Sequence, residues 1–470
     1  MSTVQGESAA AGAREVDLSA VIDALPLSAL QVRVALLCAV VLFIDAFDSI
    51  SLGFIAPRLS HVWHLLPGAL GPVFASGFLG QLFGAIVAGP VADRVGRKRV
   101  LVAGLVEFGL GALATTQAHS LEFLLGIRLI TGFGLGAALP NAIALTTEVS
   151  PVAHRSTLLV IALCGITLGA AAAGAIAARL LPHYGWTSVF WVGGLAPLVL
   201  APLLAWGLTE SPYLLAVAGS RDGQIRAFLR RIGGPAAAVA SDARFVVREE
   251  RASGLTVRHL FSHGRAVATI LLWTIVFMNN FEIYVFASWL PSIARASGLT
   301  EEASVLTGVA LNLGGLAGTL AMGWLLESFS IERMMAVVYA AAAGFIAALA
   351  LVAGDRWLMG ICSAAAGFCI VGGQTGANAL IAYRHPTYIR STALSWGLGA
   401  GRIASIVGPL AVGWVISLGW SSKATFLSAV IPALCASAAV LWLGERVAAA
   451  GAAPARAGSL SPPAPRPRDA

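Results

Sequence analysis

Twelve apolar runs of about 20 residues or more follow one another along this chain, and they determine its fold class. Each run is long enough to cross the ~30 Å hydrocarbon core of a bilayer as a helix. Only 11% of the 470 residues are charged, against roughly 25% in soluble domains, which is too few to cover a surface that faces water. We therefore predict an all-α membrane protein with twelve transmembrane helices, at 32–57, 71–91, 100–118, 122–146, 156–180, 187–208, 266–290, 303–326, 333–353, 357–382, 392–416 and 423–444.

The apolar runs fall into two groups of six, separated by a polar interval. The first run is too long for a cleaved signal peptide, so we expect it to remain as an anchor. Within the polar interval, 221–231 and 242–252 could form amphipathic helices on a solvated linker, or alternatively a partner-binding site. The expected parts are an N-terminal tail (1–31), an N-terminal six-helix bundle (32–208), a central loop (209–265), a C-terminal six-helix bundle (266–444) and a disordered tail (445–470).

The basic residues lie mainly in loops on one side of the predicted membrane. If both termini are cytoplasmic, most of the 30 Lys and Arg residues fall inside, and the outer side keeps Arg58, Arg179, Arg295, Arg356 and Lys423. Cytoplasmic loops of membrane proteins carry such an excess. We therefore predict a multi-pass protein of the cell inner membrane with both termini in the cytoplasm. Orientation explains the net charge of +7, so we expect no nucleic-acid partner.

Polar signals recur at matching places in the two halves. The segment 89–99 follows the second predicted helix and 323–333 follows the eighth. Likewise, 148–155 follows the fourth helix and 383–390 follows the tenth. Repeated signals in a chain of six plus six helices indicate two homologous bundles, which is the arrangement used for rocking-type alternating access.

A few ionisable residues lie inside the predicted spans, where charge is expensive. Asp45 and Asp48 are three residues apart, so they share one face of the first helix. They are candidates for reversible protonation, the alternative being a static buried pair that holds helices together. Arg128 in the fourth helix is expected to pair with one of these acids, with substrate contact as the minority interpretation.

The segment 89–99, Gly-Pro-Val-Ala-Asp-Arg-Val-Gly-Arg-Lys-Arg, resembles the loop signature of the major facilitator superfamily, and Arg128 with Gly132, Gly134 and Gly136 resembles its fourth-helix signature. Asp93 can pair with a basic neighbour, whereas a cluster that serves only as a topology anchor is the alternative. The resemblance implies a major facilitator fold and a cytoplasmic gating latch. Its expected members are Gly89, Asp93, Arg94, Gly96, Arg97, Glu148, Arg155, Glu327 and Arg390.

The first-helix segment Asp45-Ala46-Phe47-Asp48 resembles the Asp-Gly-Phe-Asp motif of aromatic acid:proton symporters, with Ala46 in place of the usual glycine. The segments 53–57, 372–380 and 395–403 are similar to the same family. This resemblance implies import of benzoate, hydroxybenzoate or a similar aromatic carboxylate by proton symport. Another organic-anion carrier, or a carrier of a sugar-like metabolite, is the alternative. No catalytic or metal-binding constellation accompanies these motifs, so we do not expect an enzyme.

A carboxylate that crosses the membrane needs a cationic partner, and Arg402 in the eleventh helix is our first choice because no acid lies near it in the sequence. The alternative is a structural arginine bonded to backbone carbonyls. Protons are the expected coupling ion, with Asp45, Asp48 and Arg128 as the coupling residues, no other cofactor, and a monomer as the expected state. The further substrate-binding candidates are Phe47, Phe54, Glu282, Tyr284, Gln374, Asn378 and Trp396.

Overall fold

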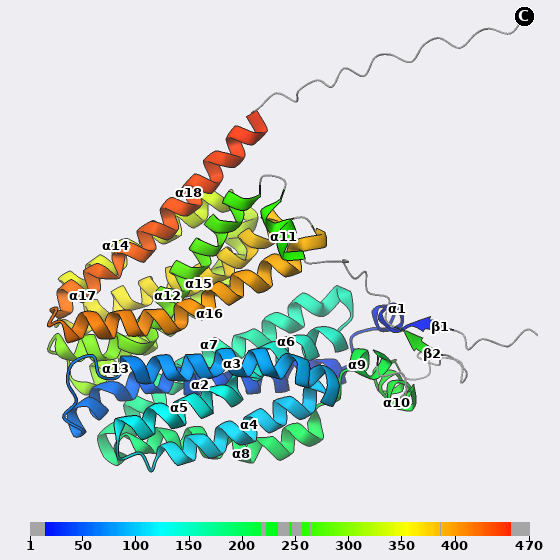
Figure 1. Ribbon diagram of the computed structural model, residues 1–470, viewed down its shortest axis with the longest axis horizontal. Coiled ribbons are helices and arrows are strands. Elements are labelled where there is room, and N and C mark those ends of the chain that lie inside the picture. The colour runs from blue at the N-terminus through cyan, green and yellow to red at the C-terminus, as the bar shows by residue number, and fades with distance from the viewer. Residues whose placement is uncertain are drawn as a thin grey trace, which may run out of the picture.

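A computed structural model of the chain describes residues 15–217, 222–233, 244–246, 256–262, 265–385 and 387–452. Long helices dominate, and they form two bundles that lie side by side (Figure 1). The N-terminal bundle contains α2 (Ala29–Val62), α3 (Gly71–Val95), α4 (Arg97–Thr115), α5 (Leu121–Gly136), α6 (Ala138–Val149), α7 (Val152–Tyr184) and α8 (Thr187–Gly207). The C-terminal bundle contains α12 (Ala266–Ala296), α13 (Glu301–Ser328), α14 (Ile331–Leu351), α15 (Arg356–Arg384), α16 (Thr387–Ser417), α17 (Ser422–Ser428) and α18 (Val430–Ala452).

The predicted spans correspond to these helices. Among the described residues, 11 helical stretches are long and apolar enough to cross a membrane. The remaining predicted span corresponds to α4, which is less apolar because it begins with Arg97, Lys98 and Arg99 and contains Glu107. Several helices continue past the apolar runs that predicted them, since backbone hydrogen bonding persists into their polar ends.

Two of the predicted spans are each divided into two helices. The fourth span breaks at Ala137, between α5 and α6, and the twelfth breaks at Ala429, between α17 and α18. In each case a proline, Pro140 or Pro432, follows three residues later. Proline has no backbone N–H to donate and its ring crowds the preceding turn, so the break falls where the helix would otherwise be strained.

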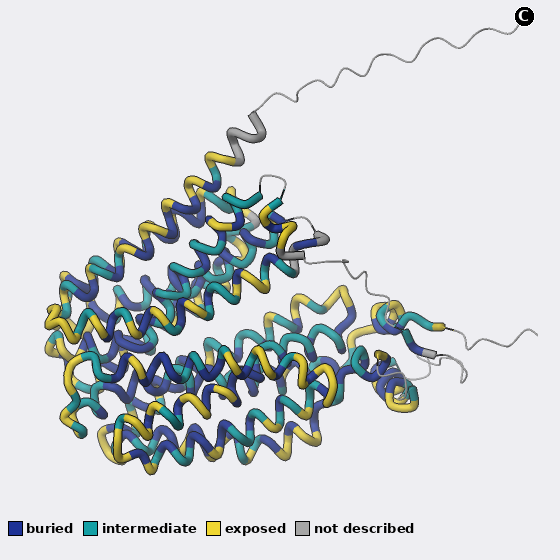
Figure 2. The backbone as a smooth tube through the Cα atoms, viewed as in Figure 1, coloured by how far each residue is buried: buried dark blue, intermediate teal, exposed yellow. Residues whose placement is uncertain are grey.

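Helix packing repeats between the bundles, as the sequence repeats predict. In the N-terminal bundle α2 packs on α7, α3 on α5 and α4 on α8; in the C-terminal bundle the equivalent pairs are α12 with α16, α13 with α15 and α14 with α18. Small residues permit the close approach: a Cβ added at Gly165 of α7 would lie 2.1 Å from the carbonyl oxygen of Ala39 in α2. Buried residues face the inside of each bundle and exposed residues lie on its outside (Figure 2). Many of the exposed residues are large and apolar.

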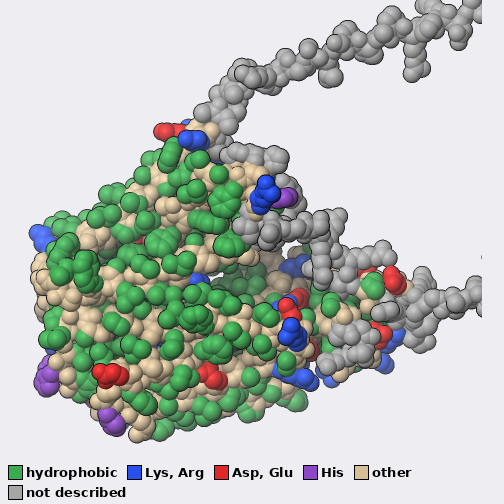
Figure 3. All heavy atoms as spheres, in the orientation of Figure 1, with side chains coloured by type: hydrophobic (Ala, Val, Ile, Leu, Met, Phe, Trp, Pro, Cys, Tyr) green, Lys and Arg blue, Asp and Glu red, His purple; other side chains and the backbone are tan. Residues whose placement is uncertain are grey.

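The two ends of the molecule differ. The short helices α1 (Leu18–Asp23), α9 (Pro212–Val217) and α10 (Asp222–Gly233) lie together at one end of the N-terminal bundle, and α11 (Thr256–Phe261) lies at the same end of the C-terminal bundle (Figure 1). We call this the basic end because these helices contribute Arg230, Arg231 and Arg258 to it. At the basic end the molecule is hollowed between the bundles (Figure 3). The bundles meet through α7 and α13, α3 and α16, and α2 and α12.

Contacts between the bundles close the end opposite the basic end. A Cβ added at Gly53 of α2 would lie 2.0 Å from the carbonyl oxygen of Ala287 in α12. Close by, Arg58 forms an ion pair of 3.5 Å with Glu301, and Phe54 is wedged between Gly174 of α7 and Gly308 of α13. The structure therefore has one closed end and one open end.

Part of the predicted N-terminal tail is folded at the basic end. Residues Glu15–Asp17 form strand β1, which pairs in parallel with strand β2 (Arg244–Val246) of the central loop. Ser19 in α1 hydrogen-bonds the hydroxyl of Tyr213 in α9 at 2.8 Å. The amphipathic helix expected at 221–231 is present as α10, whose residues Ile225, Phe228, Leu229 and Ile232 are buried.

The prediction of a second amphipathic helix at 242–252 is wrong at residues 244–246. These residues are extended because they pair with β1. The rest of that segment lies outside the described residues, as does most of the predicted tail from 445 onward. Together, α1, α9, α10 and the two strands cover the basic end of the N-terminal bundle, since their apolar residues join its core.

Candidate substrate and proton site

A buried ion pair joins two helices of the N-terminal bundle. Arg128 in α5 donates from Nη1 and Nη2 to the two carboxylate oxygens of Asp48 in α2, at 3.1 and 2.6 Å. The side chains are 4% and 1% exposed, and the Arg128 guanidinium also lies 5.7 Å from the ring centroid of Phe190. Paired and bidentate contacts of this kind make two charges tolerable in a low-dielectric interior. Both carboxylate oxygens of Asp48 are therefore occupied by hydrogen bonds from Arg128 in this conformation.

Asp45 lies one turn before Asp48 but has a different environment. It is half-buried, and its Oδ1 atom is buried without a hydrogen-bond partner among the described residues. It interacts electrostatically with the guanidinium of Arg402, in the other bundle, and with the carboxylate of Asp48. The two acids of the first helix therefore divide into one that is neutralised by hydrogen bonds and one that is not.

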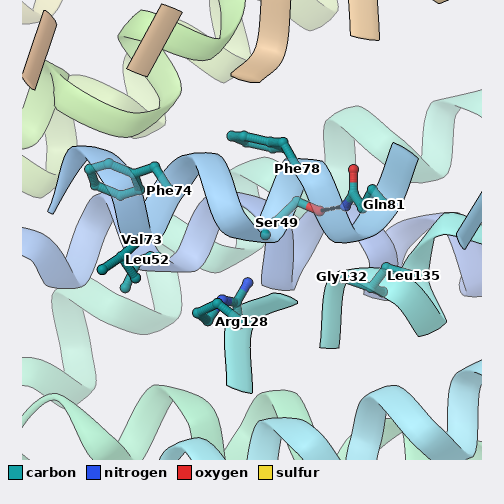
Figure 4. A pocket seen from close by; sticks show the side chains of 10 residues that line it. Ser49, Leu52, Val73, Phe74, Phe78, Gln81, Arg128, Gly132 and Leu135 are labelled. Atoms are coloured by element: carbon teal, nitrogen blue, oxygen red, sulfur yellow. Dashed lines mark hydrogen bonds between the residues drawn. The ribbon is translucent and has the colours of Figure 1, made fainter. Parts of the chain in front are cut away.

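Arg402 in α16 is held by a neutral amide from the opposite bundle. Its Nη1 donates to Oε1 of Gln81 in α3 at 2.9 Å, and Gln81 Nε2 donates to the hydroxyl of Ser49 in α2 at 2.6 Å. Figure 4 shows the Ser49–Gln81 bond, with Arg128 on the N-terminal-bundle side of α3. The amide of Gln81 accepts a hydrogen bond from the guanidinium but carries no charge, and Asp45 interacts with the guanidinium electrostatically, with no direct hydrogen bond between these two described residues. An incoming carboxylate can therefore take the place of the amide and form an ion pair with Arg402.

Two aromatic side chains face each other across the bundle interface beside this arginine. Phe78, one turn before Gln81 on α3, meets Tyr284 of α12 edge to face, with ring centroids 4.7 Å apart. Nearer the closed end, Phe74 and Trp289 meet in the same way at 5.2 Å. Figure 4 shows Phe74 and Phe78 projecting from α3 toward the C-terminal bundle. Aromatic planes at this position can contact a substrate ring.

Side-chain amides form a connected group on the C-terminal side of the interface. Gln374 Oε1 in α15 accepts from Nδ2 of Asn279 at 2.7 Å and of Asn280 at 2.9 Å, and Gln374 Nε2 donates to Asn378 at 3.2 Å. Asn280 lies against Gly401, the residue before Arg402, where an added Cβ would come within 2.7 Å of the amide nitrogen. Half-buried amides beside a cation are suited to hydroxyl groups on a bound anion.

Several sequence-based substrate candidates lie elsewhere. Phe47 is buried near Gly193 of α8, since it is on a different face of α2 from the two acids. Phe54 is part of the closed end. Trp396 is 48% exposed and stacks on Trp273 at 5.8 Å; six residues before Arg402, it lies on another face of α16. We expected these three side chains to contact the substrate directly. Their positions do not fit contact with a substrate that is bound beside Arg402.

Glu282 also departs from its expected place in the cavity. It is 1% exposed and faces other helices of its own bundle, near the backbone of Ala433, the phenol of Tyr339 and the thiol of Cys369. Tyr284, Gln374, Asn378 and Arg402, by contrast, do meet at the bundle interface. Sequence reasoning missed Ser49, Phe78 and Gln81; a glutamine inside an apolar span was the available signal for the last.

The predicted latch is a network at the basic end of the N-terminal bundle. Arg97 donates to both oxygens of Glu148, at 2.9 and 2.6 Å, and lies 3.7 Å from Asp93. The hydroxyl of Ser211 donates to Glu148 at 2.5 Å. Arg155 instead bonds the carbonyl of Ser150. Arg94 is exposed, and the side chains of Glu327 and Arg390 lie outside the described residues.

The C-terminal bundle has an equivalent ion pair with the signs exchanged. In the N-terminal bundle the base begins α4 and the acid lies near the end of α6, as Arg97 and Glu148. In the C-terminal bundle the acid, Glu332, lies in the first turn of α14 and the base, Arg384, ends α15. Each pair therefore ties together equivalent helix ends at the basic end, which keeps each bundle compact where the two bundles separate.

Glycine is required at one position of the predicted latch and not at another, which gives a stability test. Gly96 has φ 116° and ψ 142°, and an added Cβ would lie 2.2 Å from Glu210 Oε2, whereas a Cβ at Gly89 meets nothing within 4 Å. We expect Gly96→Ala to lose about 1–3 kcal/mol of stability through backbone strain alone. The unfolding temperature of the purified variant should therefore be several degrees lower than that of Gly89→Ala, the matched control. Equal unfolding temperatures for the two variants would contradict the assigned strain.

Comparison with known proteins identifies the family. The sequence model of the Major Facilitator Superfamily matches residues 38–396, and the chain belongs to this superfamily. A solved bacterial homologue of the human lysosomal transporter Spinster, in an inward-facing and occupied conformation, shares the fold with a TM-score of 0.67 at 14% identity, over 88% of this chain and 96% of that one. The protein is therefore a multi-pass membrane transporter and not an enzyme.

Two relatives are similar over nearly their whole length. The 4-hydroxybenzoate transporter PcaK of Pseudomonas aeruginosa is 37% identical over 429 residues, which cover 91% of this chain and 96% of that protein. The gallate transporter of Pseudomonas putida is 39% identical over 432 residues, which cover 92% and 95% respectively.

Proposed function

We propose that this transporter imports a ring-hydroxylated aromatic carboxylate together with protons. The main support for this proposal is the environment of Arg402. Its guanidinium lies between the bundles and donates a hydrogen bond to the neutral amide of Gln81. The two relatives described above are transporters of 4-hydroxybenzoate and gallate, both benzoates that carry ring hydroxyls. A site for such a molecule needs a cation, an aromatic surface and hydrogen-bonding groups for the hydroxyls.

The interface supplies these three features side by side. The substrate carboxylate displaces Gln81 and pairs with Arg402 through charge-assisted hydrogen bonds. The ring lies beside Phe78 and Tyr284, and its hydroxyls bond the amides around Gln374. This assignment leaves Phe47, Phe54 and Trp396 outside the binding site.

Asp45 is the proton carrier in this proposal, and Asp48 is not. Asp48 is committed to Arg128 by two hydrogen bonds, whereas Asp45 is stabilised as an anion by the nearby charge of Arg402. When a substrate carboxylate neutralises Arg402, Asp45 loses that stabilisation in a poorly solvated site and binds a proton. Proton and anion then leave together, because departure of the anion restores the interaction of Asp45 with Arg402.

The orientation of the transporter in the membrane follows from the distribution of arginine. We place the basic end in the cytoplasm of the inner membrane, since positively charged loops are retained there. The hollow at that end is then the inward-facing cavity, and the closed end with the Arg58–Glu301 ion pair is the outer gate. Both termini are cytoplasmic in this orientation, and the latch network joins the cytoplasmic ends of the N-terminal helices.

Uptake into proteoliposomes with an acidic exterior tests the proposal. We expect 4-hydroxybenzoate and gallate to accumulate, benzoate and phenylpropionate to compete more weakly because they lack ring hydroxyls, and lactate and glucose neither to accumulate nor to compete. A protonophore should abolish accumulation. Accumulation of glucose or lactate alone would favour another proton symporter of the superfamily, and aromatic-acid accumulation that survives the protonophore would refute proton symport.

A further inference from the structure

The buried acid Glu282 lies within the membrane-spanning part of the chain, and the groups that interact with it among the described residues include no cation. Glu282 in α12 is 1% exposed, and both of its carboxylate oxygens are buried without a hydrogen-bond partner among the described residues. The titratable groups that face it are the Tyr339 phenol of α14 and the Cys369 thiol of α15, while α18 contributes the backbone of Ala433. None of these groups neutralises a carboxylate.

An isolated carboxylate in such a place costs several kcal/mol or more. Burial without a cationic neighbour among the described residues therefore favours the uncharged carboxylic acid of Glu282 in this conformation, and that form can donate a hydrogen bond. Asp48, which is equally buried, has the guanidinium of Arg128 as its partner at 2.6 Å. The two buried acids thus have different electrostatic environments.

A hydrogen-bond acceptor without a donor lies one helical turn away. The Oδ1 atom of Asn279 is buried and unpartnered among the described residues, and side chains three positions apart on a helix are neighbours. The other end of the same amide, Nδ2, donates to Gln374 at 2.7 Å. Tyr339, beside Glu282, donates to the carbonyl of Gly373 at 3.3 Å, the residue before Gln374. Glu282 is therefore adjacent to the amide group that borders Arg402.

We propose that Glu282 is a second proton-binding site, which is loaded in this conformation and releases its proton when the C-terminal bundle rearranges around Gln374. The proposal rests on the proposed function for the substrate and for the first proton at Asp45. Its consequence is a change in the charge moved. A monovalent anion with one proton is electroneutral, whereas the same anion with two protons carries one positive charge inward.

Electrogenic transport distinguishes the two cases. With a fixed pH gradient, a membrane potential of 100 mV, negative inside, should raise steady-state accumulation of 4-hydroxybenzoate by wild type about 50-fold for one charge moved. Glu282→Gln keeps the shape and the uncharged state of the side chain but cannot release a proton. We expect this variant to accumulate substrate with the pH gradient and to show no response to the potential.

Glu107→Gln is the matched control. Glu107 in α4 is also an acid whose carboxylate oxygens are buried and unpartnered among the described residues, but it lines a groove between α3, α4 and α5 of the other bundle. This variant should respond to the potential as wild type does. Substrate counterflow, which moves no net proton, should persist in both variants and show that they are folded.

When both variants show counterflow, any of three outcomes overturns the proposal: wild-type transport that does not respond to the potential, Glu282→Gln transport that retains the wild-type response, or a Glu107→Gln variant that loses the response as Glu282→Gln does. If Glu282→Gln shows no counterflow, the proton-to-substrate ratio of wild type, measured from its reversal potential, decides instead: two supports the proposal and one contradicts it. A wild-type protein that transports no aromatic acid refutes the proposed function itself and the second site with it.

Discussion

Replacing Arg402 by alanine should raise the KM for 4-hydroxybenzoate at least 100-fold. The guanidinium is the one group that compensates the substrate carboxylate in the proposed site, and truncating one member of a desolvated, hydrogen-bonded charge pair costs about 2–5 kcal/mol. The folded protein should change little, because Arg402 is half-buried and its direct hydrogen bond is to Gln81. Initial uptake rates over a wide substrate range, normalised to the amount of protein in the membrane, provide the measurement.

Two variants control this experiment. Arg402→Lys keeps the charge but loses the planar fork that pairs with a carboxylate, so its KM should fall between those of wild type and Arg402→Ala. Arg295→Ala removes an exposed arginine at the closed end, where it donates to the carbonyl of Leu299, and should leave the KM near the wild-type value. A KM for Arg402→Ala within a few-fold of wild type would show that Arg402 is a structural arginine.

Asp45→Asn should eliminate accumulation driven by the pH gradient while counterflow of 4-hydroxybenzoate persists. Asparagine has almost the same shape as aspartic acid and mimics its protonated form, so the substrate still binds and crosses. In the proposed mechanism Asp45 is the site whose protonation depends on substrate at Arg402. Without it the movement of substrate is no longer linked to the movement of protons, including the proton of Glu282, so accumulation above equilibrium is lost at every external pH. Parallel assays of gradient-driven uptake and of counterflow in the same vesicles provide the measurement.

Asp48→Asn separates coupling from folding. It leaves Arg128 buried with no anionic partner, and breaking a buried pair in this way costs about 3–5 kcal/mol. Asp48→Asn should therefore reduce the amount and thermal stability of the folded protein, whereas Asp45→Asn should not. Normal gradient-driven accumulation by Asp45→Asn, or equal instability of the two variants, would contradict the division of roles between these two acids.

Much of the fold could be predicted because the bilayer constrains a sequence strongly. A chain in hydrocarbon must satisfy its backbone hydrogen bonds internally, so apolar runs of sufficient length become helices, and the repeats at 89–99 and 323–333 relate the two halves. The ion pair of Arg128 with an acid of the first helix was also predictable, because an unpaired charge inside the membrane-spanning part costs a large free energy. Which of the two acids it selects depends on the rotation of α2, which the sequence does not show.

The rest of the site depends on the direction in which each helix faces and on contacts between distant segments. Gln81 and Arg402 are 321 residues apart, so no local pattern connects them. Glu282 is two residues before Tyr284, and yet it faces the interior of its bundle whereas Tyr284 reaches Phe78. The fold of residues 15–25 was missed because β1 exists only through its pairing with β2, more than 200 residues later.

The ion pairs at the basic end and the close contacts at the opposite end fit one conformational cycle. Arg97–Glu148 and Glu332–Arg384 each lie within a single bundle, so they survive when the bundles move apart. Arg58–Glu301 and the contact of Gly53 with Ala287 join the two bundles and must break when the outer end opens. The energetic barrier between the two conformations is therefore expected to lie largely in the contacts of the closed end.

In the proposed cycle an aromatic anion and protons cross the membrane in the same step. The most direct test is to add 4-hydroxybenzoate to energy-depleted cells that express the transporter, in a weakly buffered medium, and to record the external pH and the uptake together. We predict immediate alkalinisation of the medium, in constant proportion to the substrate taken up and absent in Asp45→Asn. Substrate uptake with no change in external pH would contradict proton symport.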